Sequence, residues 1–170
     1  MKTKLILFAL SLQLFVACNK DDDKPQNPID QLPPATQTGA NTFGCLINGE
    51  PFVVSNTSNQ TAIYQGGVLQ IGGSIDNSDM DVNIILRISE SISINTIYSL
   101  TNITFNQSLF INNGNGCYYD FANTISGSVT ITNFDQTNFI ISGTFNFSTE
   151  TNECENITIT NGRFDLQYIP

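Results

Sequence analysis

The sequence predicts an all-β domain, either an antiparallel β-sandwich or a flattened β-barrel of about ten short strands. From residue 39 onward no helical 3.6-residue period is visible, and apolar residues recur at every second position, as in Val82, Ile84, Leu86 and Ile88. Asn-Gly pairs, which suit tight hairpin turns, lie between some of these segments. Only 12% of the residues are charged, so Asn, Thr, Ser and Gln must supply most of the polar surface. Periodicity alone does not decide between sandwich and barrel.

The first predicted hairpin surrounds Asn48-Gly49. Both central residues of a type I′ turn need positive φ, which Asn and Gly tolerate best. A two-residue loop at this point pairs Cys45 with Phe52 and Phe43 with Val54. Apolar residues then face apolar residues across the two strands, which supports the register.

The middle of the chain contains further predicted strands, at residues 60–65, 68–74, 82–88, 96–100, 108–111 and 117–121. A second hairpin is predicted from two alternating segments, one with Ile125, Val129 and Ile131 and the other at 139–147, joined by a turn at 133–137. Gly127 and Gly143 occupy inward positions in these segments, which indicates bulges or close backbone approach.

A third hairpin is predicted around Asn161-Gly162. A two-residue loop there pairs Ile159 with Phe164 and Ile157 with Leu166. Residues 163 and 165 alternate with Phe164, so Arg163 and Asp165 are expected on one face of the hairpin as an architectural pair.

The N-terminal 17 residues are typical of a signal peptide, because a basic start at Lys2 and Lys4 precedes an apolar run from residue 5 to 17. Thirteen helical residues span about 20 Å, too short for a hydrocarbon core of about 30 Å. The run ends in Leu14-Phe15-Val16-Ala17-Cys18, which resembles the lipobox of lipoproteins although Phe15 replaces the usual Leu. We therefore expect cleavage before Cys18 and lipidation of that cysteine.

Residues 18–38 are predicted to form a lipidated, disordered tether that is acidic and rich in proline, and residues 39–170 a single all-β domain. Within the tether, Lys20-Asp21-Asp22 resembles the signal that exports Bacteroidota lipoproteins to the outer face of the outer membrane. The alternative is an ordinary solvated charged linker.

Three segments resemble a family of uncharacterised Bacteroidota lipoproteins that carry a domain of unknown function. They are Thr38 to Gly49 (TGANTFGCLING), Ile141 to Phe147 (ISGTFNF) and Ile159 to Asp165 (ITNGRFD). The resemblance implies export and an all-β fold and assigns no activity.

Missing residue types exclude most enzyme classes. The chain has no His, which removes imidazole bases, the usual catalytic triads and the HExxH zinc site, and no Lys follows Lys24. From residue 39 onward two arginines face eleven acids, a net charge of 2 − 11 = −9, so nucleic acid is not expected as a partner. We expect no enzyme, and a hydrolase working with two carboxylates is the alternative.

Asp76, Asp79 and Asp81 form the one weak metal candidate. They lie with amide and hydroxyl oxygens in a short polar segment between two strands, and oxygen ligands suit Ca²⁺. The segment lacks the Gly and Glu of an EF-hand loop. An ordinary polar turn is the favoured interpretation of this segment, and no other cofactor is expected.

Besides Cys18, the chain contains three cysteines, which in an exported protein allow one disulfide and one free thiol. Cys117 follows an Asn-Gly-rich loop and Cys154 lies in a polar turn, so this pair is the first choice. Cys45 alternates with apolar residues and is expected to be a free core residue, or else an alternative disulfide partner.

Tyr118 and Tyr119 are weak candidates for ligand binding. They are adjacent in a predicted strand, so one of them should face outward, where an aromatic ring could stack on a sugar. The plainer interpretation is a tyrosine anchored at the edge of the core.

The leading functional hypothesis is a surface-exposed outer-membrane lipoprotein that contacts the membrane through its lipid anchor only. Its β domain would bind a ligand or partner without catalysis, for example a glycan or an outer-membrane protein. The alternatives are a glycosidase-like hydrolase and a purely structural envelope protein.

Overall fold

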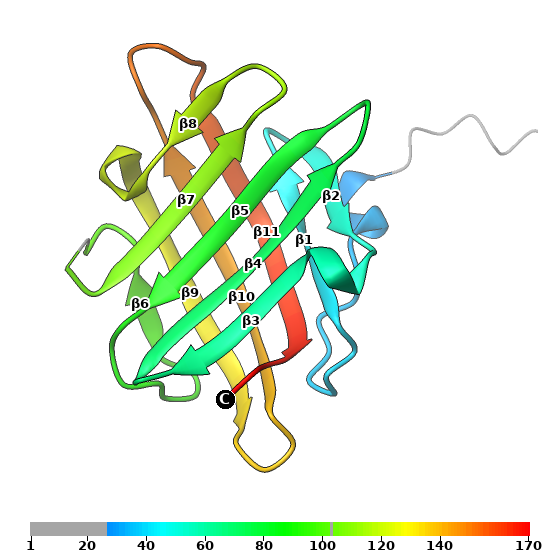
Figure 1. Cartoon of the computed structure of the whole chain (residues 1–170), viewed down its shortest axis with the longest axis vertical. Helices are drawn as coiled ribbons and strands as arrows, with labels where there is room; N and C mark the ends of the chain where they lie inside the picture. The colour runs from blue at the N-terminus through cyan, green and yellow to red at the C-terminus, as the bar shows by residue number, and fades with distance from the viewer. Residues whose placement is uncertain (1–26, 103) are drawn as a thin grey trace, which may run out of the picture.

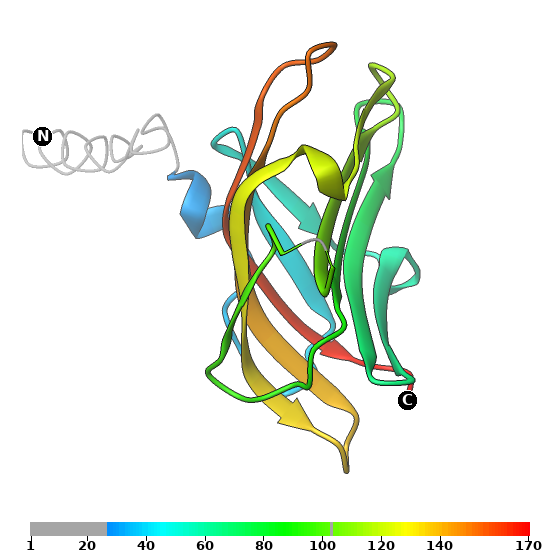
Figure 2. The same cartoon turned by 90° about the vertical axis from the view of Figure 1, so that its left-hand side faces the viewer.

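The computed structural model describes residues 27–102 and 104–170, and these form an antiparallel β-sandwich (Figures 1 and 2). The two sheets are not closed into a barrel, so the choice left open by the sequence is decided for the sandwich. The predicted signal peptide, Cys18 and the first part of the tether lie outside the described residues. Within the described ranges, no helix is long and apolar enough to cross a membrane.

One sheet has six strands in the order β2-β1-β11-β10-β9-β6, and the other has five in the order β3-β4-β5-β7-β8. The strands are β1 (Thr42–Ile47), β2 (Glu50–Val54), β3 (Gln60–Gln65), β4 (Val68–Asp76), β5 (Asp81–Ile88), β6 (Ile97–Ser99), β7 (Asn106–Asn112), β8 (Cys117–Tyr119), β9 (Thr124–Asp135), β10 (Ile140–Thr149) and β11 (Ile157–Gln167). The described residues also contain three short 3₁₀ helices, η1 (Pro28–Gln31) before β1, η2 (Thr57–Asn59) between β2 and β3, and η3 (Phe121–Asn123) between β8 and β9.

The core lies between the two sheets and is built by the predicted alternation. In β5, Val82, Ile84, Leu86 and Ile88 are all buried, while Arg87 points to solvent. Burying a side chain of this size stabilises the fold by about 1.5–3 kcal/mol. The inner faces of the other strands supply matching apolar residues, so that one continuous cluster joins both sheets.

The predicted hairpin at Asn48-Gly49 is confirmed. The two residues have φ of 50° and 91°, and Cys45 pairs with Phe52 and Phe43 with Val54 as expected. This hairpin places β2 at the edge of the six-stranded sheet.

The predicted hairpin at Asn161-Gly162 is wrong, because both residues lie inside the continuous strand β11. This strand lies between β1 and β10, and its register shifts against both neighbours beside these residues. Asn161 has φ of 53°, so the pair forms a bulge instead of a turn. A Cβ on Gly162 would lie 2.5 Å from the carbonyl oxygen of Phe145, which explains why glycine is required.

The β9–β10 hairpin exists, with two corrections. Its turn lies at residues 136–139 and not at 133–137, because β9 continues to Asp135. Ile125 is 53% exposed although it was expected to face inward. The register between β9 and β10 shifts next to it, and Gly127 has φ of 149°, so a bulge turns Ile125 outward.

Residues 27–41, which we call the strap, are held against the outer side of the six-stranded sheet (Figure 2). Leu32 is only 7% exposed, and the Arg163 guanidinium donates a hydrogen bond to the Pro33 carbonyl oxygen at 3.2 Å. The prediction of a disordered tether therefore fails for residues 27–38. The polar, proline-rich composition of this segment does not reveal its hydrogen-bond partner Asp165, which lies more than 120 residues downstream.

Candidate functional site

A cleft of about 520 Å³ opens at one end of the sandwich, the upper end in Figure 1. Its walls come from the β1–β2 turn, the β4–β5 turn, the β7–β8 loop and the start of β11. Its apolar part contains Ile47, Met80, Val82, Phe110 and Ile157. Clefts of this volume accommodate small ligands. No single segment of the sequence forms this site, because four separate connections meet there.

Four carboxylates line the same cleft, those of Glu50, Asp79, Asp81 and Glu155, together with several asparagines. Neither of the two arginines in the described residues belongs to the lining. The field in the cleft is therefore negative, which disfavours anionic ligands and favours neutral or positively charged ones. Asparagine side chains offer both donors and acceptors for a polar ligand.

The predicted calcium ligands do not come together as a metal site. Asn77 organises the β4–β5 turn, since its Oδ1 accepts hydrogen bonds from the backbone N–H groups of Asp79 and Met80, both at 2.9 Å. Asp81 accepts a hydrogen bond from Asn113 at 2.8 Å, and Asp76 pairs with it across the strands. Among the described residues, no group of three or more acidic, Cys or His side chains is placed to hold a metal ion. The segment is a polar turn at the rim of the cleft.

The disulfide expected from the sequence is present between Cys117 and Cys154, whose Cα atoms lie 6.1 Å apart. It connects β8 to the loop that follows β10. Beside it, the Tyr119 hydroxyl donates a hydrogen bond to the Glu155 backbone carbonyl at 2.5 Å. These two links fix the loop that brings Glu155 to the rim of the cleft.

Cys45 is a free thiol in the centre of the core, with no exposed surface. Burial raises its pKa to about 12, so the thiol stays protonated at physiological pH. It is the small core residue that the alternation indicated, and it takes no part in the disulfide.

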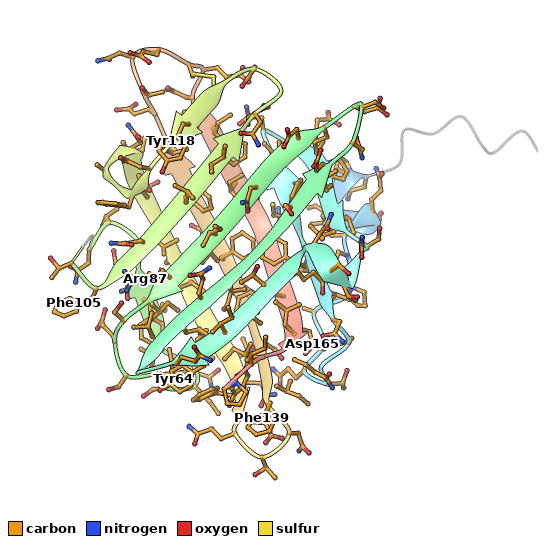
Figure 3. All side chains as sticks on the ribbon, in the orientation of Figure 1. Tyr64, Arg87, Phe105, Tyr118, Phe139 and Asp165 are labelled. Atoms are coloured by element: carbon orange, nitrogen blue, oxygen red, sulfur yellow. A yellow bond between two sulfur atoms is a disulfide. The ribbon has the colours of Figure 1, made fainter. Side chains whose placement is uncertain are left out.

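The two adjacent tyrosines face opposite sides of the five-stranded sheet, as expected for neighbours in a strand. Tyr118 is 57% exposed on the outer face, where Figure 3 shows it, and Tyr119 is 1% exposed in the core. Burial and the nearby Glu155 carboxylate raise the pKa of Tyr119. Tyr118 is thus accessible, whereas Tyr119 supports the rim of the cleft from inside.

Asp165 is the one carboxylate without exposed surface among the described residues. It accepts hydrogen bonds from the hydroxyls of Thr36 and Ser142, at 2.6 and 2.8 Å, and from backbone N–H groups of residues 38–40 at 2.8–3.2 Å. Burial alone would raise its pKa, but these donors outweigh it and lower the pKa to about 2. Asp165 holds the strap to the domain, a role that the sequence did not reveal. Arg163 binds the Pro33 carbonyl oxygen, so the two side chains have separate partners.

The fold and the cleft define a two-sheet β-sandwich domain with a ligand-sized, acidic opening at one end. The sequence profile of DUF6252, a domain of unknown function, matches residues 42–166, and the chain belongs to this family. The resemblance to a domain of unknown function is thereby confirmed, whereas the link to Bacteroidota lipoproteins stays a prediction. The search of curated proteins and the search of solved structures each gave no significant match.

Proposed function

We propose that this chain is an exported lipoprotein, anchored at the outer-membrane surface through an acylated Cys18, whose β-sandwich binds a ligand without catalysis. The cleft carries the proposal, because it combines an apolar floor with polar groups in one concave place. The purely structural alternative expects no pocket at all, and the cleft argues against it.

The disulfide and the sequence pattern together support export. Disulfides persist mainly in oxidising compartments, and Cys117 and Cys154 form one in this structure. The basic and apolar start of the chain and the lipobox-like segment before Cys18 supply the means of export and anchoring.

The ligand of the cleft is neutral or positively charged. Four carboxylates line the cleft, and its lining within the part of the chain that the structure describes has no lysine or arginine to pair with a phosphate, sulfate or carboxylate group. Suitable ligands include amines and peptides with lysine or arginine, held by charge at the rim and by the apolar floor.

Titrations followed by NMR test this proposal with spermidine and trilysine as cationic probes and triglutamate as the anionic probe. Binding of a cationic probe with shifts at the cleft, and none of triglutamate, supports it. The double variant Glu50→Gln and Glu155→Gln should weaken binding at least about tenfold, since Coulomb attraction is lost at both sides of the rim. Both side chains lie at the cleft lining, and Glu153→Gln, outside the lining, is the matched control. Equal affinity of all three proteins, or no binding of either cationic probe, would contradict a positively charged ligand.

A hydrolase that uses two carboxylates is the second candidate. One observation favours it, because four acids line a single cleft instead of being dispersed on convex surface. Incubation with neutral polysaccharides and detection of new reducing ends decides between the two. Release of sugar that Asp79→Asn or Asp81→Asn abolishes would establish the hydrolase, and its absence leaves the binding module.

A further inference from the structure

Four aromatic rings meet at the end of the sandwich opposite the cleft, where Figure 3 labels Tyr64 and Phe139. Tyr168 is central to this group, with ring centroids 6.2, 5.6 and 5.8 Å from those of Tyr64, Phe134 and Phe139. Tyr168 is buried, Tyr64 and Phe134 are half-buried, and Phe139 is 43% exposed. The cluster therefore packs on the core and still presents an aromatic surface to solvent.

Phe139 has an unusual backbone conformation for its residue type. Its φ is 56°, in the left-handed region that Asn and Gly adopt readily and that strains a bulky residue. The conformation is imposed from two sides. Its carbonyl accepts a hydrogen bond from the Tyr168 N–H at 2.7 Å, and Asp135 accepts hydrogen bonds from the backbone N–H groups of Thr137 and Asn138 just before it. An exposed phenyl ring thus stands on a fixed turn where a polar residue would fit better.

Amide side chains and one carboxylate, that of Asp135, lie in or beside the turn that carries Phe139. Gln136 and Asn138 belong to the same turn, and Gln167 pairs with Ile140, next to Phe139. The Asp135 carboxylate accepts three hydrogen bonds from Thr137 and Asn138 in its own turn. These hydrogen bonds involve both carboxylate oxygens and lower the pKa of Asp135. The turn thus offers an apolar ring with amide donors and acceptors, and among the described residues neither Arg87 nor Arg163 belongs to it.

We propose that this aromatic end is a carbohydrate-binding surface, on which a neutral sugar ring stacks against Phe139 while the neighbouring amides bind its hydroxyls. A rigid exposed aromatic with neutral amides matches the two kinds of surface on a sugar, its C–H face and its hydroxyl rim. A membrane headgroup fits less well, because the domain carries an excess of acids and anionic lipids would be repelled. The surface is independent of the acidic cleft.

Isothermal titration of the mature chain, with Cys18→Ser to remove the anchor, tests this with neutral hexasaccharides of glucose, xylose and N-acetylglucosamine. We expect at least one to bind, Phe139→Asn to weaken it about five- to tenfold, and Phe139→Tyr to retain it. Asn tolerates the left-handed φ, so Phe139→Asn relieves strain, and a thermal melt verifies that it folds. Phe105→Asn is the matched control, since Phe105 is 48% exposed in a loop away from the cluster.

The proposal is overturned if no hexasaccharide binds at millimolar concentration, or if Phe139→Asn and Phe105→Asn bind like the parent. Flotation with phosphatidylcholine vesicles is the second arm, and Phe139-dependent vesicle binding without sugar binding would assign the surface to lipid instead. The Glu50→Gln and Glu155→Gln variant should retain full sugar affinity. Failure at the cleft and failure at the aromatic end are thereby distinguishable.

Discussion

The Thr36 hydroxyl donates a hydrogen bond of 2.6 Å to the Asp165 carboxylate, across 129 residues of sequence. Backbone N–H groups of the strap converge on the same carboxylate, which lies in β11 between β1 and β10. One buried charge thus joins the segment before the first strand to the last strand. Among the described residues, the strap is therefore part of the fold, which was expected to begin only at residue 39.

Replacing Asp165 with Asn should destabilise the domain by about 3 kcal/mol, because an amide presents donors to backbone donors that then stay buried without partners. Urea unfolding measures the loss, and limited proteolysis should show new cleavage within residues 36–40. Ser142→Ala, which removes one of the donors, is a milder control with a loss of about 1 kcal/mol. An Asp165→Asn protein as stable and as protease-resistant as the parent would show that the strap is not held by this charge.

The same carboxylate makes stability depend on acid. Because the folded-state pKa of Asp165 is lowered from 3.8 to about 2, its contribution is complete above pH 4 and is lost as pH falls toward 2. The difference in unfolding free energy between the parent and Asp165→Asn should shrink by about 2 kcal/mol between pH 5 and pH 2. Using the difference cancels the titration of the other acids. A difference that stays constant over this range would contradict the lowered pKa.

Gly162→Ala should cost more than about 2 kcal/mol, because the new methyl group meets the Phe145 carbonyl oxygen at 2.5 Å and the bulge in β11 must shift. Gly114→Ala is the control. Gly114 lies in the β7–β8 loop, and the nearest atom to a Cβ there is the Asn112 Oδ1 at 3.3 Å. Denaturant midpoints of the two variants should therefore differ clearly, and equal midpoints would refute the close approach.

Removing the disulfide by Cys117→Ser and Cys154→Ser should lower stability by about 3–4 kcal/mol, as expected for a closed loop with a sequence separation of 37 residues. Cys45 provides an internal check, because its buried thiol with a pKa of about 12 should resist alkylation at pH 8 until the protein unfolds. An unchanged melting temperature of the double variant would contradict the stabilising role of the disulfide. Rapid labelling of Cys45 in the folded double variant would show that its core is less tightly packed than that of the parent.

The two Asn-Gly pairs show what the sequence could predict and what it could not. Both pairs favour a turn locally. At Asn48 the two flanking strands, β1 and β2, pair with each other, so the local preference for a turn produces a hairpin. At Asn161 the strand has neighbours on both edges, and the same preference for positive φ is used in a bulge. Local patterns predicted the strands, whereas their order depends on contacts distant in sequence.

In the candidate site, too, local features could be predicted from the sequence and features that depend on distant contacts could not. The Cys117–Cys154 pair and the outward turn of one tyrosine were predictable, since they follow from loop character and strand alternation. The cleft was not, because it forms where separate connections meet, and neither was the burial of Asp165. An acid in an alternating strand looks solvent-exposed until the segment that covers it is known.

Mass spectrometry of the intact protein, purified from membranes of the cells that produce it, is the decisive test of the proposed lipid anchoring of this domain. We expect a chain that begins at Cys18 and carries the added mass of a diacylglycerol and an amide-linked acyl chain. A chain that still begins at Met1, or one cleaved elsewhere and free of lipid, would contradict it.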